Sequence, residues 1–234
     1  MKTIQTLFAA VLTTGSIGAC LAADLTGKVT LDGTPPKEVV IDPLMSDRVC
    51  GPLHPGAPVT TRHYVVSADK GLGDVFVYVK AGLEGKKFEP TGPEPKLNQV
   101  GCLYDPYILG VMAGQTFKVV NSDPFMHNVH ATPKNNPEFN FAQLSAGAEN
   151  EKSFANPEVL VRVKCDVHPW MFAYIGVSEN PFFAVTDKDG NFKISGLPAG
   201  KYTLTAFHRK AGAQDQQVTV GADNQTVSFT LKVP

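Results

Sequence analysis

Apolar and polar residues alternate with a period of two along much of this chain, which is the pattern of β-strands that bury one face. No segment has the apolar spacing of a convincing amphipathic helix. We expect strands at residues 25–31, 74–79, 159–165, 172–177 and 201–207, and two more within 104–121. Residues 80–100 and 131–152 are polar and contain several prolines, so we expect connections there, the second with at most a short helical turn. The pattern predicts an all-β protein.

Turn residues divide the C-terminal segment into short strands. Asp189-Gly190 predicts a hairpin at 185–192, and a turn at 221–224 predicts another hairpin that joins 216–220 to 226–233. The segment resembles the transthyretin/carboxypeptidase-regulatory-like β-sandwich at Asp187, Gly190, Phe192, Ile194, Leu197, Pro198, Gly200, Tyr202 and Leu204. The opening half of that family is similar to residues much further upstream, namely Gly27, Val29, Gly33, Pro35 and 75–79.

The separation of these two halves predicts a discontinuous domain. Residues 24–95 plus 180–234 would form one sandwich, and residues 96–178 would be a second domain inserted at an exposed tip of the first. Two alternatives remain open from the sequence, namely two or three consecutive small β domains, or a single fused sandwich.

The N-terminus has the features of an export signal at residues 1–22. Lys2 precedes an apolar run from 7 to 19 that is too short to span a bilayer comfortably, and small residues around Ala22 offer a cleavage site. A passable lipobox ends at Cys20, so lipidation at Cys20 is an alternative to complete removal. No later apolar run approaches transmembrane length. We therefore expect an exported, periplasmic protein.

Length and charge narrow the class of protein only slightly. The 234 residues allow one or two domains, and the formal net charge of −1 gives no indication of nucleic-acid binding. Of the four cysteines, Cys20 lies in the signal, and Cys50 and Cys102 can form a disulfide in an oxidising compartment. Cys165 is then the one unpaired thiol.

Cys165 opens the sequence Cys-Asp-Val-His-Pro-Trp-Met, which holds a thiolate, an imidazole and a thioether within seven residues. Period-two alternation places Cys165 on the buried face of its strand, and Met171 shares the inward parity of the strand that follows. His127 follows another strand across a turn and can reach the same end of a sandwich. Two imidazoles, one thiolate and a weak axial methionine are the ligands of a mononuclear blue-copper site, so we expect one copper ion at His127, Cys165, His168 and Met171.

Other ligand assignments fit less well. Zinc also accepts cysteine and histidine but gains little from a thioether, and a binuclear copper site needs a second cysteine in the loop. His130 lies three residues after His127 and points to the opposite face, so we expect a structural or exposed role. Met126 is the rival axial ligand. His54, His63 and His208 have no partner at ligand-like spacing, and the Asp187 turn lacks the glycine that an EF-hand loop requires.

Residues 96–178 resemble a cupredoxin, a Greek-key sandwich, and among cupredoxins the amicyanin type with its short ligand loop. The matching residues are His127, Asn128, His130, Cys165, His168, Pro169 and Met171, together with Tyr104, Pro106, Val111, Ala113, Gly114, Gln115 and Asn121. The resemblance implies the same four copper ligands. It also implies that Asn128 lies behind them, tethering the ligand loops and hydrogen-bonding near the thiolate.

These observations favour a blue-copper electron carrier, not an enzyme. A cytochrome, dehydrogenase or oxidase would dock transiently on an apolar patch of Phe125, Met126, Pro169 and Trp170, with electrons leaving through His168. One alternative is a periplasmic protein that binds and delivers copper. The other is a non-redox assembly module with a degenerate copper site.

Overall fold

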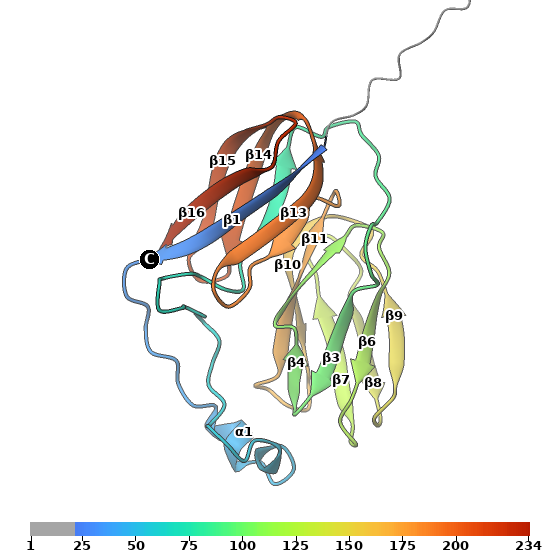
Figure 1. Cartoon of the computed structure of the whole chain (residues 1–234). Coiled ribbons are helices and arrows are strands. Elements are labelled where there is room, and N and C mark those ends of the chain that lie inside the picture. The colour runs from blue at the N-terminus through green and yellow to red at the C-terminus, as the bar shows by residue number, and fades with distance from the viewer. Residues whose placement is uncertain (1–21) are drawn as a thin grey trace, which may run out of the picture.

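The computed structural model describes residues 22–234 (Figure 1). The proposed signal, except for Ala22, and the alternative lipid site at Cys20 lie outside the described residues. Across 22–234, no helix has both the length and the apolar character needed to cross a membrane.

The fold is all-β, as the alternation predicts. In chain order the strands are β1 (Ala22–Asp32), β2 (Phe76–Ala81), β3 (Lys96–Val100), β4 (Leu103–Asp105), β5 (Ile108–Met112), β6 (Phe117–Asn121), β7 (His127–Thr132), β8 (Phe139–Gln143), β9 (Glu149–Lys152), β10 (Glu158–Lys164), β11 (Phe172–Ser178), β12 (Phe183–Val185), β13 (Asn191–Pro198), β14 (Gly200–His208), β15 (Gly212–Val220) and β16 (Gln225–Lys232). Between β1 and β2 lie a short α-helix, α1 (Asp42–Ser46), and a 3₁₀ turn, η1 (Gly51–Leu53).

Strands from both ends of the described chain build one sandwich, which we call the terminal sandwich. One sheet has the order β13-β1-β16, in which β1 runs parallel to β16 from Leu25 opposite Gln225 to Asp32 opposite Lys232. The other sheet has the order β12-β2-β14-β15. Alternate residues of these strands meet between the two sheets in one buried core that includes Leu25, Val77 and Phe229. Figure 1 shows β1 in blue lying between β13 and β16.

Strands β3 to β11 build the middle sandwich. Its sheets have the orders β5-β11-β10-β7-β8 and β4-β3-β6-β9, and two neighbouring pairs, β5–β11 and β3–β6, are parallel. Its core is separate from that of the terminal sandwich and contains Phe117, Phe154, Cys165 and Met171. The alternation in β10 places Val161, Val163 and Cys165 on this inner face because successive side chains of a strand point to opposite faces.

The two sandwiches pack together through aromatic rings that lie on glycines. A Cβ atom added to Gly176 of β11 would lie 2.8 Å from ring carbons of Phe76, and one added to Gly110 of β5 would lie 2.8 Å from the ring of Phe183. Phe76 and Phe183 belong to the terminal sandwich and are themselves in ring contact, with centroids 5.8 Å apart. Glycine at both positions lets the rings approach the sheet backbone closely.

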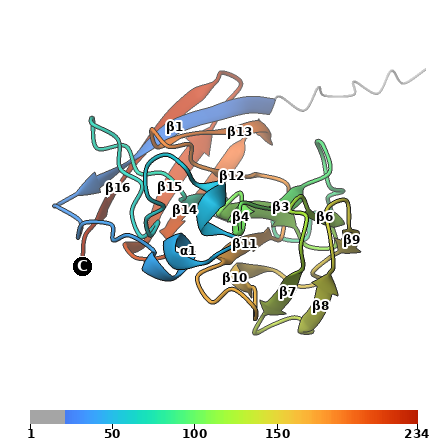
Figure 2. The same cartoon turned by 90° about the horizontal axis from the view of Figure 1, so that it is seen from below.

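A segment that we call the strap, residues 41–62, carries α1 and η1 and crosses the end of the middle sandwich near β4 and β11 (Figure 2). The Cys50–Cys102 disulfide fastens the strap to the turn between β3 and β4. Leu44 and both cysteines are fully buried there, and Phe125 and Trp170 of the middle sandwich pack against them. The cysteine pattern predicts the disulfide, but no sequence pattern predicts the helical strap.

The predicted C-terminal hairpins are wrong in their pairing. The Asp189-Gly190 turn forms, with the Asp187 carboxylate accepting hydrogen bonds from Asp189 N and Asn191 N, but β12 joins the sheet of β2 whereas β13 joins the sheet of β1. In the same way β15 pairs with β14, and β16 crosses to β1. Turn residues specify a local reversal of the chain, but not the sheet that the next strand enters.

Strand boundaries in the middle sandwich also differ from the expectation. Residues 104–121 hold three strands where we expected two, and residues 131–152 contain β8 and β9 where we expected irregular chain. Strand β9, with sequence Glu-Asn-Glu-Lys, is at the edge of its sheet and has no buried residue. An edge strand of polar residues lacks the alternation on which a sequence prediction depends.

Candidate metal centre

The ligand loop joins β10 to β11 and is closed by two main-chain hydrogen bonds. The Cys165 N–H donates to the Met171 carbonyl at 3.0 Å, and the Met171 N–H donates to the His168 carbonyl at 2.9 Å. Cys165 and Met171 are both buried in the core of the middle sandwich. The loop therefore holds Cys165 and Met171 next to each other at one end of the sandwich, as their strand parity predicts.

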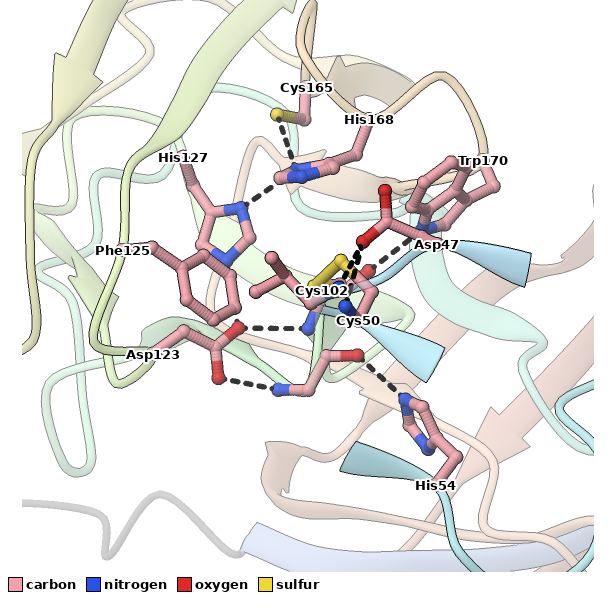
Figure 3. Close-up of a disulfide and its surroundings, with 12 residues drawn as sticks. Asp47, Cys50, His54, Cys102, Asp123, Phe125, His127, Cys165, His168 and Trp170 are labelled. Carbon is pink, nitrogen blue, oxygen red and sulfur yellow. Dashed lines mark hydrogen bonds and ion pairs between the residues drawn. A yellow bond between two sulfur atoms is a disulfide. The ribbon is translucent and has the colours of Figure 1, made fainter. Parts of the chain in front are cut away.

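Three of the predicted ligand atoms converge at this end (Figure 3). His168 Nδ1 lies 3.7 Å from Cys165 Sγ and 3.1 Å from His127 Nδ1. A metal about 2.0–2.3 Å from each nitrogen or sulfur ligand leaves neighbouring ligand atoms roughly 3.3–3.8 Å apart. The 3.7 Å sulfur–nitrogen distance has this spacing and the 3.1 Å nitrogen–nitrogen distance is slightly shorter, so the three side chains could hold a single ion.

Cys165 is held in a setting that favours its thiolate. Burial raises the pKa of Cys165, but hydrogen bonds from His127 and from the main-chain N–H groups of Asn128, His168 and Val167 lower it by more. The Asn128 N–H lies 3.4 Å from Cys165 Sγ. Because the thiolate is the form that binds metals, the net lowering of the pKa prepares Cys165 as a ligand.

His127 is oriented by Asp123, a residue that is not among those predicted from the sequence. His127 Nε2 lies 2.7 Å from Asp123 Oδ2, and both side chains are buried. Burial lowers the pKa of His127, but Cys165 and Asp123 raise it by more. The carboxylate fixes the proton on Nε2 and leaves Nδ1 directed toward His168, the arrangement expected behind a metal-binding histidine. The only sequence signal is an aspartate four residues before the histidine.

Asp123, which lies between β6 and β7, also contacts the disulfide-bearing turn between β3 and β4. Its two carboxylate oxygens accept hydrogen bonds from Gly101 N and Cys102 N, each at 2.8 Å. One buried carboxylate thus connects His127 to Cys102, and Figure 3 shows the two bonds from Asp123 to the turn side by side.

Asn128 ties the strand of His127 to the ligand loop. Its Oδ1 accepts a hydrogen bond from Asp166 N at 3.0 Å, next to the Asn128 N–H that faces the Cys165 sulfur. Tyr104 adds a second tie, since its hydroxyl donates to the Asn128 carbonyl at 2.7 Å and lies 3.3 Å from the Lys164 carbonyl. These contacts correspond to the tethering role that the sequence resemblance implies for Asn128.

The remaining sulfur and histidine candidates lie elsewhere. Met126 is 40% exposed whereas Met171 is fully buried, so Met171 is the better placed thioether. His130 lies on the other side of β7, between Asp166 Oδ2 at 2.8 Å and Glu138 Oε1 at 2.6 Å. His54, His63 and His208 contact Gly101 O, Arg209 and main-chain N–H groups respectively. None of these four histidines joins the cluster.

The strap covers much of the surface around His168, where the sequence predicts an exposed docking patch. Potential ligand atoms of His168, Cys50 and Cys102 lie within 4.8 Å of one another, although the two cysteines are joined and have no thiolate to offer. Trp170 donates from Nε1 to the Cys102 carbonyl at 3.3 Å. Of the predicted docking patch, Phe125 and Trp170 are half-buried, and only Met126 and Pro169 are exposed.

Electrostatic effects at His168 differ from those at His127. Burial lowers the pKa of His168, and the neighbouring His127 lowers it further, although Asp47 of the strap and Asp123 oppose the shift. A neutral imidazole with a free lone pair is the form that binds metals. His168 is half-buried, and its ring lies 5.3 Å from that of Trp170 between centroids.

Comparison with known families gives one match within the chain. The carboxypeptidase regulatory-like domain family matches residues 173–232, which run from β11 to β16. No curated protein matches the chain.

Several solved structures are similar to part of the chain. A purple cupredoxin from Nitrosopumilus maritimus is 23% identical, with 36% of this chain and 100% of that chain covered, at a TM-score of 0.32. A copper-containing nitrite reductase from Thermus scotoductus is 25% identical over 42% of this chain and 25% of that chain, at 0.34. An oxidised proline-to-alanine mutant of amicyanin is 20% identical over 36% of this chain and 82% of that chain, at 0.33. With TM-scores this low, these similarities carry no conclusion about function.

Proposed function

We propose that this protein is a mononuclear copper electron carrier. The observation that carries the proposal is the convergence of Cys165 Sγ, His127 Nδ1 and His168 Nδ1 at spacings of 3.1 and 3.7 Å, beside a buried Met171. A thiolate, two imidazoles and a weak thioether suit copper better than the harder divalent cations. Bound copper would supply a centre that accepts and releases one electron by changing between Cu(II) and Cu(I).

The residues around the cluster favour transfer with little rearrangement. Hydrogen bonds fix Cys165, His127 and the ligand loop on a two-sheet framework, so the ligand positions need not change with the charge of the site. Cys165, His127 and Met171 are buried, which excludes water from the sulfur side. His168 is the ligand nearest the surface, and we infer that electrons pass through it.

We further propose that the protein is exported to the periplasm and exchanges electrons with a redox protein that docks transiently. The Cys50–Cys102 disulfide supports an oxidising compartment. The role of carrier, as opposed to enzyme or copper donor, is part of the same proposal.

Copper addition to the purified protein tests the proposal. We expect an intense visible absorption from thiolate-to-copper charge transfer, a reversible one-electron couple, and loss of the band in Cys165→Ser. Met126→Leu is the matched control, because it removes an exposed thioether near the site and should leave the band unchanged. A protein that stays colourless with copper, or a band that survives Cys165→Ser, contradicts the proposal. Rapid release of copper to a chelator, without reversible redox behaviour, would indicate a copper-delivery protein instead.

A further inference from the structure

Three arginines lie over one cluster of aromatic rings on the side of the middle sandwich, and we call this surface the arginine face. Tyr107, Phe172 and Tyr174 are in mutual contact, with ring centroids 5.8 to 6.1 Å apart. The Cζ atom of Arg62 lies 5.1 Å from the Tyr107 centroid, that of Arg162 lies 5.5 Å from Phe172, and that of Arg209 lies 5.1 Å from Tyr174.

The arginine face is assembled from three separate parts of the fold. Arg62 is at the end of the strap, Arg162 is on β10, and Arg209 follows β14 of the terminal sandwich. A fourth cation, Lys210, is exposed next to Arg209. Segments far apart in the sequence therefore place positive charge on one surface, although the whole chain is close to neutral with a formal net charge of −1.

Most of this charge has no internal partner. Arg62 pairs with Asp74 at 2.9 Å, but within residues 22–234 no carboxylate forms an ion pair with Arg162, Arg209 or Lys210. Arg209 instead contacts a ring nitrogen of His63 at 2.9 Å. A guanidinium group over an aromatic ring can still bind a carboxylate through its remaining N–H groups, often in a bidentate manner.

The arginine face lies close to His168, through which we infer that electrons leave the site. Trp170, whose ring contacts His168, lines a cavity of about 170 Å³ together with Arg62, Tyr107 and Phe172. A protein bound on the arginine face would thus lie beside an aromatic series that starts at His168. The end of the sandwich is less suitable, because the strap covers it and brings the Asp47 carboxylate near His168.

We propose that the arginine face is the docking site for a redox protein with an acidic surface. This inference rests on the proposed electron-transfer function. It places the partner at the side of the middle sandwich, and not on the patch of Phe125, Met126, Pro169 and Trp170 at its end. Charge complementarity of this kind mainly raises the association rate and makes it sensitive to salt.

Two probes of opposite charge test the proposal on the copper-loaded, reduced protein in stopped-flow measurements. We expect hexacyanoferrate(III), a trianion, to oxidise it at a rate that falls with ionic strength, and that falls about tenfold in the Arg162→Glu, Arg209→Glu double variant at low salt. Tris(phenanthroline)cobalt(III), a trication, should react no more slowly with this variant. A double variant of Lys86→Glu and Lys87→Glu, in the loop between β2 and β3, is the matched control and changes the net charge equally.

A binding measurement separates docking from electron transfer. NMR titration of the Cu(I) protein with an acidic c-type cytochrome should perturb amide signals of Arg62, Arg162 and Arg209 and their neighbours, and a basic cytochrome should perturb them less. Equal rate losses in the control variant, or perturbations centred on Met126 and Pro169, would overturn the docking proposal while leaving the copper site intact. Absence of the visible copper band would instead overturn the proposed function, and the titration of the metal-free protein would still report whether the face binds acidic proteins.

Discussion

The Nε2 atom of His127 lies 2.7 Å from the Asp123 carboxylate, and this buried contact connects the candidate metal centre to the disulfide-bearing turn. The same carboxylate accepts the N–H groups of Gly101 and Cys102. The position of His127, a candidate metal ligand, and that of the strap attachment therefore depend on one side chain.

Replacing Asp123 by Asn should weaken both the contact with His127 and the hydrogen bonds from Gly101 and Cys102. An amide offers one acceptor oxygen in place of two, so one charge-assisted hydrogen bond is lost and the free energy of unfolding should fall by about 1.5–3 kcal/mol. Copper affinity should fall roughly 10–100-fold, because His127 loses the group that orients it. Denaturant titration and competition with a chelator measure the two effects. Asp105→Asn, at an exposed position on β4, is the control, and equal losses there would contradict the prediction.

Removing the disulfide should destabilise the protein and uncover Trp170. The bond closes a loop with a sequence separation of 52 residues, for which chain entropy gives a stabilisation of about 4 kcal/mol. In the Cys50→Ala, Cys102→Ala variant, the emission of Trp170, the single tryptophan of the chain, should shift to longer wavelength as the strap leaves it. The visible copper band should persist, since neither cysteine is a predicted ligand. Loss of the band would show that the strap is needed to form the site.

Substitution of Gly176 should loosen the contact between the two sandwiches. A Cβ atom there would lie 2.8 Å from the ring of Phe76, so Gly176→Ala forces the ring to move and should cost about 1–3 kcal/mol of unfolding free energy. Gly56→Ala is the matched control, because a Cβ at Gly56 meets nothing within 4 Å. Thermal or denaturant unfolding distinguishes the two variants, and equal stability would mean that the ring does not rest on the glycine in solution.

Stability should decrease in weak acid because of His208. Burial, assisted by the charge of Arg209, lowers the pKa of His208 from 6.5 to about 4. The unfolded chain therefore takes up a proton that the folded protein excludes. The stabilisation is complete above a pH of about 6.5 and is lost as the pH falls toward about 4, with a total of roughly 3 kcal/mol.

Denaturant unfolding across this pH range measures the effect. His208→Gln keeps an oxygen that can accept the Lys210 and Ala211 N–H bonds but cannot be protonated, so its stability should depend less on pH. An unchanged pH profile in this variant would assign the acid sensitivity to other groups.

The sequence predicts that Cys165, His168 and His127 come together, because their positions depend on local rules. Strand parity places Cys165 and Met171 inward, and the loop length places His168 between them. The contribution of Asp123 is not predictable in this way, since an aspartate in a turn before proline is also a common turn former. Its role depends on how the turn meets Cys102, which only the folded chain determines.

The strap and the arginine face are not predictable for the same reason. The short helix at 42–46 has no amphipathic repeat, and its burial depends on one leucine and a disulfide. Arg62, Arg162 and Arg209 are scattered in the sequence and meet only when β10, β14 and the strap pack together. The pairing of β13 and β16 with β1 is likewise a property of the two-sheet packing, not of the turns before them.

The parallel pairing of β1 with β16 has a consequence for the order of folding. Leu25 meets Gln225 across 200 residues, so closing this sheet from a fully unfolded chain is entropically expensive and slow. The middle sandwich has its own core and lies wholly within this separation, so its strands can assemble before β16 has emerged from the ribosome. Once the middle sandwich has folded, a rigid body takes the place of a long flexible loop between β1 and β16. The entropic cost of bringing these two strands together is then smaller.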